Sequence, residues 1–268
     1  DQTRPDLSFG ANSCARRVAS ATVADLSFAN TVVQAAHQNR DAAIVFPRGV
    51  VMIDRAMILG WGDSSFANME GVKSQCGYYI CLANDPGFAS GGDFRKSLAL
   101  CWASTTIKRV VRATLAAEAY ASTEVIEACH WIRQVLTELR HFDANGRRPL
   151  RSLEDRSLQT CRINAYSDAH NLTQTVGKDT GAVQDKRLRI VVTMLRDSTA
   201  PPQNTTLEWV PTWKMVADAL TKIMDTGVLR AAAAAGRPRR RRAAQSATGQ
   251  PGQRRWGEDT ARRPRRPP

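Results

Sequence analysis

Four acidic residues of this sequence have the types and positions that metal-dependent chemistry requires: Asp63, Glu118, Asp168 and Asp218. Asp63 and Asp168 each end a run of residues that is typical of a β-strand. Glu118 lies seven residues before Val125, two turns earlier on the apolar side of an expected helix. Asp218 lies in the opening turn of the last expected helix. A carboxylate that faces a core is costly unless a cation compensates it, and a divalent cation would do so.

Each of these acids also has an ordinary explanation. A strand-end aspartate commonly forms a turn, an inward-facing glutamate near a helix start can reach solvent, and Asp218 can interact with the N-terminus of its own helix. As a group, carboxylates without neighbouring His or Cys ligands favour Mg²⁺ or Mn²⁺ over zinc. Two such ions about 4 Å apart are the usual apparatus for in-line cleavage of a phosphodiester. We therefore take the four acids as candidate catalytic and metal-binding residues.

The elements that must position these acids follow from hydrophobic patterning, which predicts an α/β protein of order βββαβαβα. The pattern predicts strands over residues 58–63, 77–83, 97–104, 162–167 and 206–210. It predicts helices over residues 115–141, 186–196 and 212–224, the last capped by Thr212. Residues 1–50 are expected to be helical and loop-like, and residues 143–160 to form a loop.

The net charge of +13 over 268 residues and a pI near 10.1 make nucleic acid the first partner to consider. Residues 226–268 contain 12 arginines and two acids, a net charge of +10, which leaves +3 for the first 225 residues. This Arg-, Pro- and Ala-rich tail has almost no large apolar residue, so we expect it to be disordered. It is either a phosphate-binding arm or unselected read-through sequence. The overall charge therefore agrees with a nucleic-acid partner without identifying one.

Composition and cysteine placement limit the compartment. With 43% apolar residues, most of the chain can form a core, and no apolar run approaches the roughly 20 residues that cross a bilayer. The start has neither an initiator Met nor a signal-peptide pattern, so we expect a piece of a longer intracellular protein, in a cytoplasmic particle or the nucleus, that is not secreted. The six cysteines form no CxxC pair, which predicts reduced thiols and no structural zinc. Cys76 and Cys81 should lie on opposite faces of a strand.

Nine short stretches resemble, in the same order, elements of one family, the ribonuclease H region of the Pol polyprotein of copia-type LTR retrotransposons. They span about residues 3–224. The first resembles the TRPDI-type motif at the end of the reverse transcriptase, and the last two resemble the closing VPT and LADxLTK elements. The stretches are TRPDLSF (3–9), GDSSFA (62–67), KSQCG (73–77), TLAAEA (114–119), HWIR (130–133), YSD (166–168), DKRL (185–188), WVPT (209–212) and VADALTK (216–222).

The resemblance implies a ribonuclease H-like fold, a five-stranded mixed sheet flanked by helices. It implies that the four acids hold two Mg²⁺ or Mn²⁺ ions and hydrolyse the RNA strand of an RNA·DNA hybrid, with Asp63 bridging both ions. One ion would activate the attacking water and the other would stabilise the leaving 3′-oxygen. It divides the chain into residues 1–50, the end of a reverse transcriptase or its connection, residues 51–225, the ribonuclease H-like domain, and the tail of residues 226–268. The reverse transcriptase of the same polyprotein is then a partner.

The sequence also departs from the family pattern. Many members carry a histidine near the segment that is residues 184–189 here, where this chain has none. His170, two residues after Asp168, either handles a proton during product release or packs or faces water. Ser65 replaces the second acid of the DxDW-type motif, a change expected to be harmless.

Other residues remain open to two interpretations. Lys108, Arg109 and Arg112, just before the long helix, either bind phosphates or form a solvated turn. Three tryptophans are expected in the core rather than as stacking platforms: Trp102, Trp131 and Trp213.

Two rival functions remain. One is a catalytically inactive relic or connection-like module that keeps the fold and at most binds nucleic acid. The other is a general basic nucleic-acid-binding protein that acts through its tail.

Overall fold

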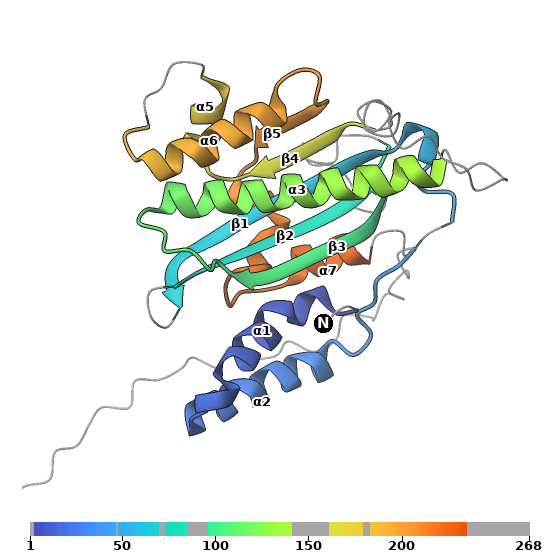
Figure 1. Ribbon diagram of the computed structural model, residues 1–268. Helices are drawn as coiled ribbons and strands as arrows, with labels where there is room; N and C mark the ends of the chain where they lie inside the picture. The colour runs from blue at the N-terminus through green and yellow to red at the C-terminus, as the bar shows by residue number, and fades with distance from the viewer. Residues whose placement is uncertain are drawn as a thin grey trace, which may run out of the picture. The chain divides into compact units, whose positions relative to one another are not determined.

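A computed structural model describes residues 3–46, 48–69, 73–84, 96–140, 161–178 and 183–234. Its centre is a five-stranded mixed sheet of order β3-β2-β1-β4-β5 (Figure 1). β1, β2 and β3 are antiparallel neighbours, and β4 and β5 run parallel to β1. The strands are β1 (Met57–Met69), β2 (Lys73–Ala83), β3 (Ser97–Thr106), β4 (Ile163–Ser167) and β5 (Thr205–Trp209). All five predicted strands are present, and β1 is longer than the pattern indicated.

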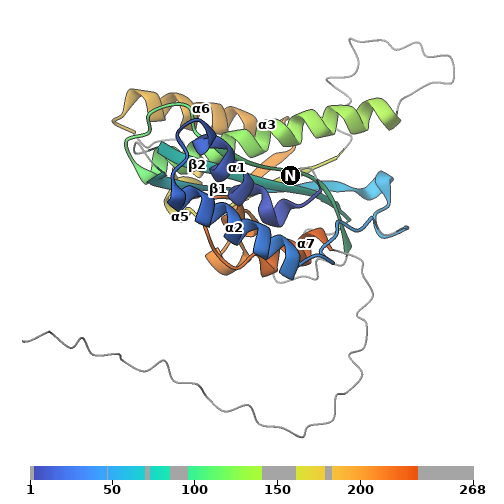
Figure 2. The same cartoon turned by 90° about the horizontal axis from the view of Figure 1, so that it is seen from below.

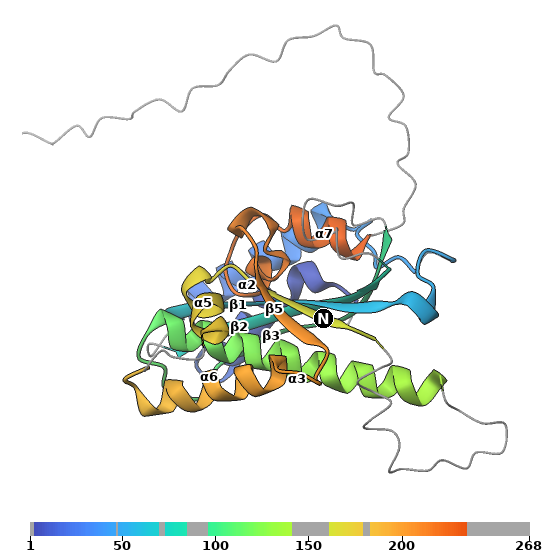
Figure 3. The same ribbon diagram turned by 90° about the horizontal axis from the view of Figure 1, so that it is seen from above.

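Helices cover both faces of the sheet, as Figures 2 and 3 show. One face packs against α3 (Thr114–Arg140), α5 (His170–Gly177) and α6 (Lys186–Thr199). The other packs against the 3₁₀ turn η9 (Val216–Leu220) and α7 (Gly227–Ala233). The other helices of the described residues are α1 (Ser8–Arg17) and α2 (Val23–Gln38), with 3₁₀ turns η1 (Pro5–Leu7), η2 (Val18–Ser20), η3 (Ile53–Arg55) and η8 (Thr212–Lys214). The predicted five-stranded mixed sheet flanked by helices is confirmed.

The α3 face is aliphatic. Val125, Cys129 and Ile132, the first residues of the predicted apolar stripe, are buried there with Ile58 and Ile163 of the sheet. The stripe ends before the helix does, because Leu139 is 67% exposed. Buried residues of other types still run from Ala117 to Thr137, so the helix is anchored along most of its length, including the part that carries Glu118.

The opposite face is rich in aromatic residues. Trp61 is fully buried against Tyr79 and Tyr166, with ring centroids 6.1 and 5.2 Å away, and Leu220 and Leu229 close the cluster. Such a rigid layer fixes the end of β1 that leads to Asp63.

Two elements differ from the expected order. The helix predicted from Thr212 is instead the pair of 3₁₀ turns η8 and η9, and Thr212 does not cap a helix through its side chain. Its hydroxyl bonds to Asp168 instead, so a tertiary contact takes the group that local capping would have used. Helix α5 was not predicted, because its eight residues bury only Leu172 and Val176, too few positions to define a helical stripe in the sequence.

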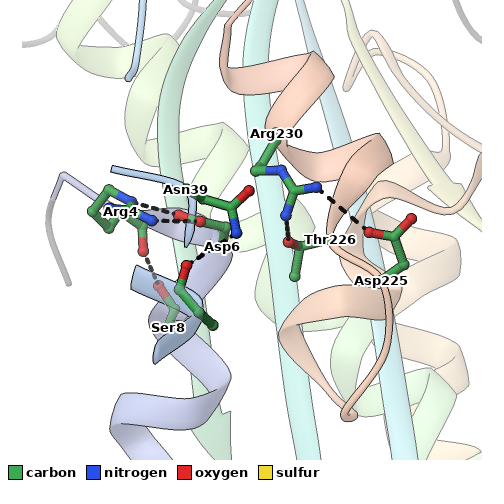
Figure 4. Close-up of polar contacts among 8 residues, drawn as sticks. Arg4, Asp6, Ser8, Asn39, Asp225, Thr226 and Arg230 are labelled. Atoms are coloured by element: carbon green, nitrogen blue, oxygen red, sulfur yellow. Dashed lines mark hydrogen bonds and ion pairs between the residues drawn. The ribbon is translucent and has the colours of Figure 1, made fainter. Parts of the chain in front are cut away.

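The folded part also continues past residue 226, where the sequence predicted a disordered tail. Helix α7 buries Leu229, and the backbone N–H of Val45 donates to the carbonyl of Ala233 at 3.0 Å. Arg230 pairs with Asp225 at 3.6 Å beside the N-terminal residues, as Figure 4 shows. The first arginine of the tail is therefore structural. Residues 235–268, and the loop expected over 143–160, lie outside the described residues.

The six cysteines are all free thiols, and Cys76 and Cys81 lie on opposite faces of β2 as predicted. Among the described residues, the helices lack the combination of length and apolar character that a membrane span requires.

Candidate metal centre

Three of the four candidate acids meet at one end of the sheet. Carboxylate oxygens of Asp63, Asp168 and Asp218 lie within 4.8 Å of one another, and within the described residues this is the only group of three or more potential metal ligands. The three residues come from the middle of β1, the end of β4 and the turn η9. Segments more than 150 residues apart in the sequence are thus brought to one point by the sheet order.

Asp63 is the most enclosed of the three, with 3% of its surface exposed. It shares the β1 face with Trp61 and pairs with Gly77 of the neighbouring strand β2. The Thr221 hydroxyl donates a hydrogen bond to its Oδ2. Burial raises the pKa of Asp63 well above its usual range, and the nearby Glu118 charge adds to the rise, while the Thr221 bond opposes it. Such a carboxylate ionises readily only when a cation joins it.

Asp218 lies buried in η9 at 4% exposure. Lys222, one turn later, places its Nζ 2.7 Å from Asp218 Oδ1. Burial lowers the pKa of Lys222, but the hydrogen bond and charge of Asp218, together with the charges of Asp63 and Asp168, outweigh burial and raise it. The ammonium is therefore the one basic group shown to pair with this cluster in the described part of the chain.

Asp168 directly follows β4 and is partly exposed. Its carboxylate accepts a hydrogen bond from the Thr212 hydroxyl at 2.9 Å, and its carbonyl accepts one from the Trp209 indole Nε1 at 3.0 Å. β5 and η8 therefore fix both the backbone and the side chain of this residue.

Glu118 approaches from the other face of β1, on α3. It is outside the 4.8 Å group but is buried at 6% exposure, and its Oε1 accepts a 2.7 Å bond from the Ser64 hydroxyl. Its Oε2 is buried without a hydrogen-bond partner in the described structure. Burial raises the pKa of Glu118 to about 7; the Ser64 bond opposes this and the charge of Asp168 adds to it. An orphaned carboxylate oxygen is what a further ligand would satisfy.

The chemistry of these donors fits a hard divalent cation. Carboxylate oxygens without His or Cys are the ligands of Mg²⁺ and Mn²⁺. Four acids face one lysine here, and the pKa values of Asp63 and Glu118 are raised first by burial and then by the charges of neighbouring acids. A bound cation would relieve both the mutual repulsion and the unpartnered oxygen of Glu118.

Sequence reasoning missed the residues that hold the acids: Ser64, Thr212, Thr221 and Lys222. One signal was available, since Lys222 lies four residues after Asp218, a spacing that pairs charges on a helix. The hydroxyl groups carried no such signal, because their partners lie 44 or more residues away.

The other candidate residues, the three basic residues before α3 and His170, all lie on the surface. Lys108, Arg109 and Arg112 are exposed, and the Arg109 guanidinium lies 5.9 Å from the ring centre of Tyr120, two residues beyond Glu118 on α3. This places the basic segment at the end of α3 that carries the site. His170 is exposed and meets Trp209 edge to face, with ring centroids 5.6 Å apart.

The tryptophan predictions are wrong in two of three cases. Trp102 packs against the core as expected, but Trp131 and Trp213 are 66% and 72% exposed. Trp131 falls on the outer side of α3. Trp213 follows Thr212 in a 3₁₀ turn rather than in the predicted helix, so the helical spacing that placed it inward does not apply.

Of the known proteins compared with this chain, only solved structures are similar to it. No protein-family model and no curated protein matches the chain. The chain is similar to RNase H1 from the halophilic archaeon Halobacterium salinarum NRC-1, at 15% identity over 62% of this chain and 94% of that one, with a TM-score of 0.36. It is similar to LC11-RNase H1 in complex with RNA/DNA hybrid, at 14% identity over 61% and 93%, with a TM-score of 0.37.

A third similar structure is the foamy viral protease-reverse transcriptase in complex with RNA/DNA hybrid. The identity is 11% and the TM-score 0.39, and the match covers 66% of this chain and 21% of that one. Because these values are low, the function is inferred below from the side chains of the site and from the sequence motifs.

Proposed function

We propose that this chain is a ribonuclease H-type endonuclease that hydrolyses the RNA strand of RNA·DNA hybrids with two Mg²⁺ or Mn²⁺ ions. The observation that carries the proposal is the meeting of Asp63, Asp168 and Asp218 within 4.8 Å, next to the buried and partly unpartnered Glu118. Four acids placed together at such an electrostatic cost are more readily explained by a cation site than by stability.

Each acid has a place in this proposal. Asp63, held by Thr221, would contact both ions, while Asp168, Asp218 and Glu118 would complete their ligands. When bound, such ions supply an activated water and stabilise charge on the leaving oxygen. The exposed Lys108, Arg109 and Arg112 would bind phosphates at the Glu118 end of α3, and the RNA 2′-hydroxyls would distinguish a hybrid from duplex DNA.

We further propose that the chain derives from the Pol polyprotein of a copia-type retrotransposon. In this view residues 1–50 are the end of the reverse transcriptase, which would be a partner, residues 51–225 the ribonuclease H-like domain and residues 226–268 an added tail. The nine motifs in matching order support this origin. The helix α7 argues for moving the last boundary to the end of the compact unit at Arg237.

The test is cleavage of a labelled RNA·DNA hybrid by the full chain in Mg²⁺, compared with duplex DNA and single-stranded RNA. Asp63→Asn should lower hybrid cleavage by at least about 10²-fold, because it removes a charge that holds the ions. Asp197→Asn, which changes an exposed aspartate in α6, is the matched control and should cleave normally.

Equal cleavage by the wild type and Asp63→Asn, or no cleavage by either, would contradict the proposal. Hybrid binding without any cleavage would favour the inactive, connection-like module. To test the tail as the functional element, a chain that stops at Arg237 is preferable to one that stops at Asp225, because the shorter chain loses the buried Leu229. Cleavage by the chain ending at Arg237 would exclude the tail as the source of activity.

A further inference from the structure

Two exposed tryptophans lie next to Asp168. Trp209, the last residue of β5, is 49% exposed, and Trp213, in η8, is 72% exposed. We call these two residues the tryptophan flank. Large aromatic side chains are usually buried, and their exposure at a functional site points to a ligand.

The tryptophan flank is tied directly to the metal centre. The Trp209 indole N–H donates to the Asp168 carbonyl at 3.0 Å, and His170 packs edge-on against its ring. Thr212, the residue before Trp213, donates to the Asp168 carboxylate at 2.9 Å. Trp209 is therefore held by a contact that also positions a candidate metal ligand, and Trp213 directly follows a residue that makes a second such contact.

The flank also carries a positive charge. The Lys214 ammonium lies 4.8 Å from the centre of the Trp213 ring. The cation therefore lies over one face of the ring, and an indole that is 72% exposed can receive a base on its other face while the phosphate of that nucleotide meets the cation. In a duplex the base faces are already stacked on each other, so an exposed indole finds its partner in an unpaired base.

We propose that the tryptophan flank binds an unpaired nucleotide beside the cleavage site, so that the domain prefers hybrids that adjoin a single-stranded segment. This inference rests on the proposed function for the position of the hybrid, but the stacking interaction itself needs no cleavage. It names a substrate class, the junction between hybrid and single strand, that the four acids do not select.

A second exposed tryptophan provides an internal control. Trp131 is 66% exposed on α3, thirteen residues past Glu118, or about 20 Å along the helix. One turn earlier on the same helix lies the exposed Glu127, which disfavours a phosphate. Trp131 thus matches Trp213 in residue type and exposure, but among the described residues no cation is placed over its ring and no bond links it to Asp168.

The experiment compares two hybrids of equal paired length, one blunt and one with a five-nucleotide single-stranded extension. The RNA strands keep their 2′-hydroxyls and the buffer contains a chelator, so that affinity is measured by fluorescence anisotropy without metal-dependent cleavage. We expect the full wild-type chain to bind the extended hybrid about tenfold more tightly. Trp213→Ala should lose this preference while binding the blunt hybrid as before, Trp213→Phe should keep part of it, and Trp131→Ala should keep all of it.

A wild type that binds both hybrids equally, or a Trp213→Ala variant that keeps the full preference, would overturn the inference. The Arg-rich tail is the same in every variant, so it cannot produce a difference between them. Cleavage of an unmodified hybrid is scored separately. Cleavage without a junction preference would support the proposed function and contradict nucleotide binding by the tryptophan flank. A junction preference without cleavage would support nucleotide binding by the flank and contradict the proposed function.

Discussion

Two segments bring carboxylates to the Asp63 end of the sheet, one from each face, and they do so in different ways. On one face α3, a helix of 27 residues, brings Glu118. On the other face η9, a 3₁₀ turn of five residues, brings Asp218. Each approach depends on a glycine. A Cβ at Gly62 would lie 2.8 Å from the carbonyl oxygen of Ala121 in α3, and one at Gly77 would lie 2.6 Å from Leu220 Cβ in η9.

The difference lies in what holds each segment. Helix α3 is held by its own backbone bonds and a long buried stripe, so its position cannot change locally. Turn η9 is much shorter. It is held by the burial of its five residues against the aromatic face and, at the site, by the Thr221 hydroxyl bond to Asp63 and the Lys222–Asp218 ion pair. A long helix therefore places its acid by register, whereas a short turn places its acid by tertiary contacts.

The largest expected difference in stability between the two faces comes from changing Gly62 and Gly77 to alanine, one at a time, which adds one methyl group at each position. Gly62→Ala would push a Cβ against the backbone of α3 and against Val125, 2.9 Å away, and neither can move alone. We expect it to lower the free energy of unfolding by more than about 3 kcal/mol. Gly77→Ala meets a short turn that can shift, so it should cost less stability but displace Asp218.

Two measurements separate these outcomes. Denaturant unfolding gives the stability of each variant, and the rise of Tm with added Mg²⁺ reports whether the site still binds metal. We expect Gly77→Ala to fold but to lose most of its Mg²⁺ response. If both variants lose the same stability, α3 yields as easily as η9 and the distinction between the faces is wrong.

The same distinction explains what the sequence could predict. Strand alternation and the spacing from Glu118 to Val125 are local patterns, so the strands, α3 and the inward position of Glu118 were predictable. The helix expected from Thr212 was not formed, because the Thr212 hydroxyl bonds to Asp168, 44 residues earlier, and the chain continues as two 3₁₀ turns. No local pattern contains that contact. For the same reason, the exposure of Trp213 required the structure.

Because Glu118 on α3 is a buried acid, the stability of the metal-free protein should depend on pH. The folded pKa of Glu118 is about 7, above the ordinary value of 4.5. Between these values the unfolded chain releases a proton that the folded chain keeps, so stability falls as pH rises through this window. Glu118→Gln removes this loss and keeps an acceptor for Ser64, so above pH 7 it should be more stable than the wild type by about 2–3 kcal/mol.

The measurement is urea unfolding between pH 4 and 8 in the presence of a chelator. Asp63, whose pKa is also raised by burial, should leave part of the pH dependence in the variant, and Asp168 and Lys222 remain as the other charges facing Glu118. With Mg²⁺ added, the wild type should regain stability that the variant does not. A parallel pH profile for both proteins would show that Glu118 is not the buried acid responsible.

The smallest effect should come from the η9 side, where the acid already has a cation. Lys222→Met keeps the apolar stem and removes the charge 2.7 Å from Asp218. Because Lys222 is partly exposed, the metal-free protein should lose only about 1 kcal/mol of stability. The rise of Tm with added Mg²⁺ should nevertheless be larger in the variant than in the wild type. The reason is that the ammonium no longer competes with the ion for the Asp218 carboxylate. A larger Mg²⁺ response in Lys222→Met, together with a smaller one in Glu118→Gln, would place Asp218 and Glu118 at one ion site. It would also show that the charge of the acid is neutralised by a lysine on the η9 face but not on the α3 face. An unchanged Mg²⁺ response in Lys222→Met would remove Asp218 from that site.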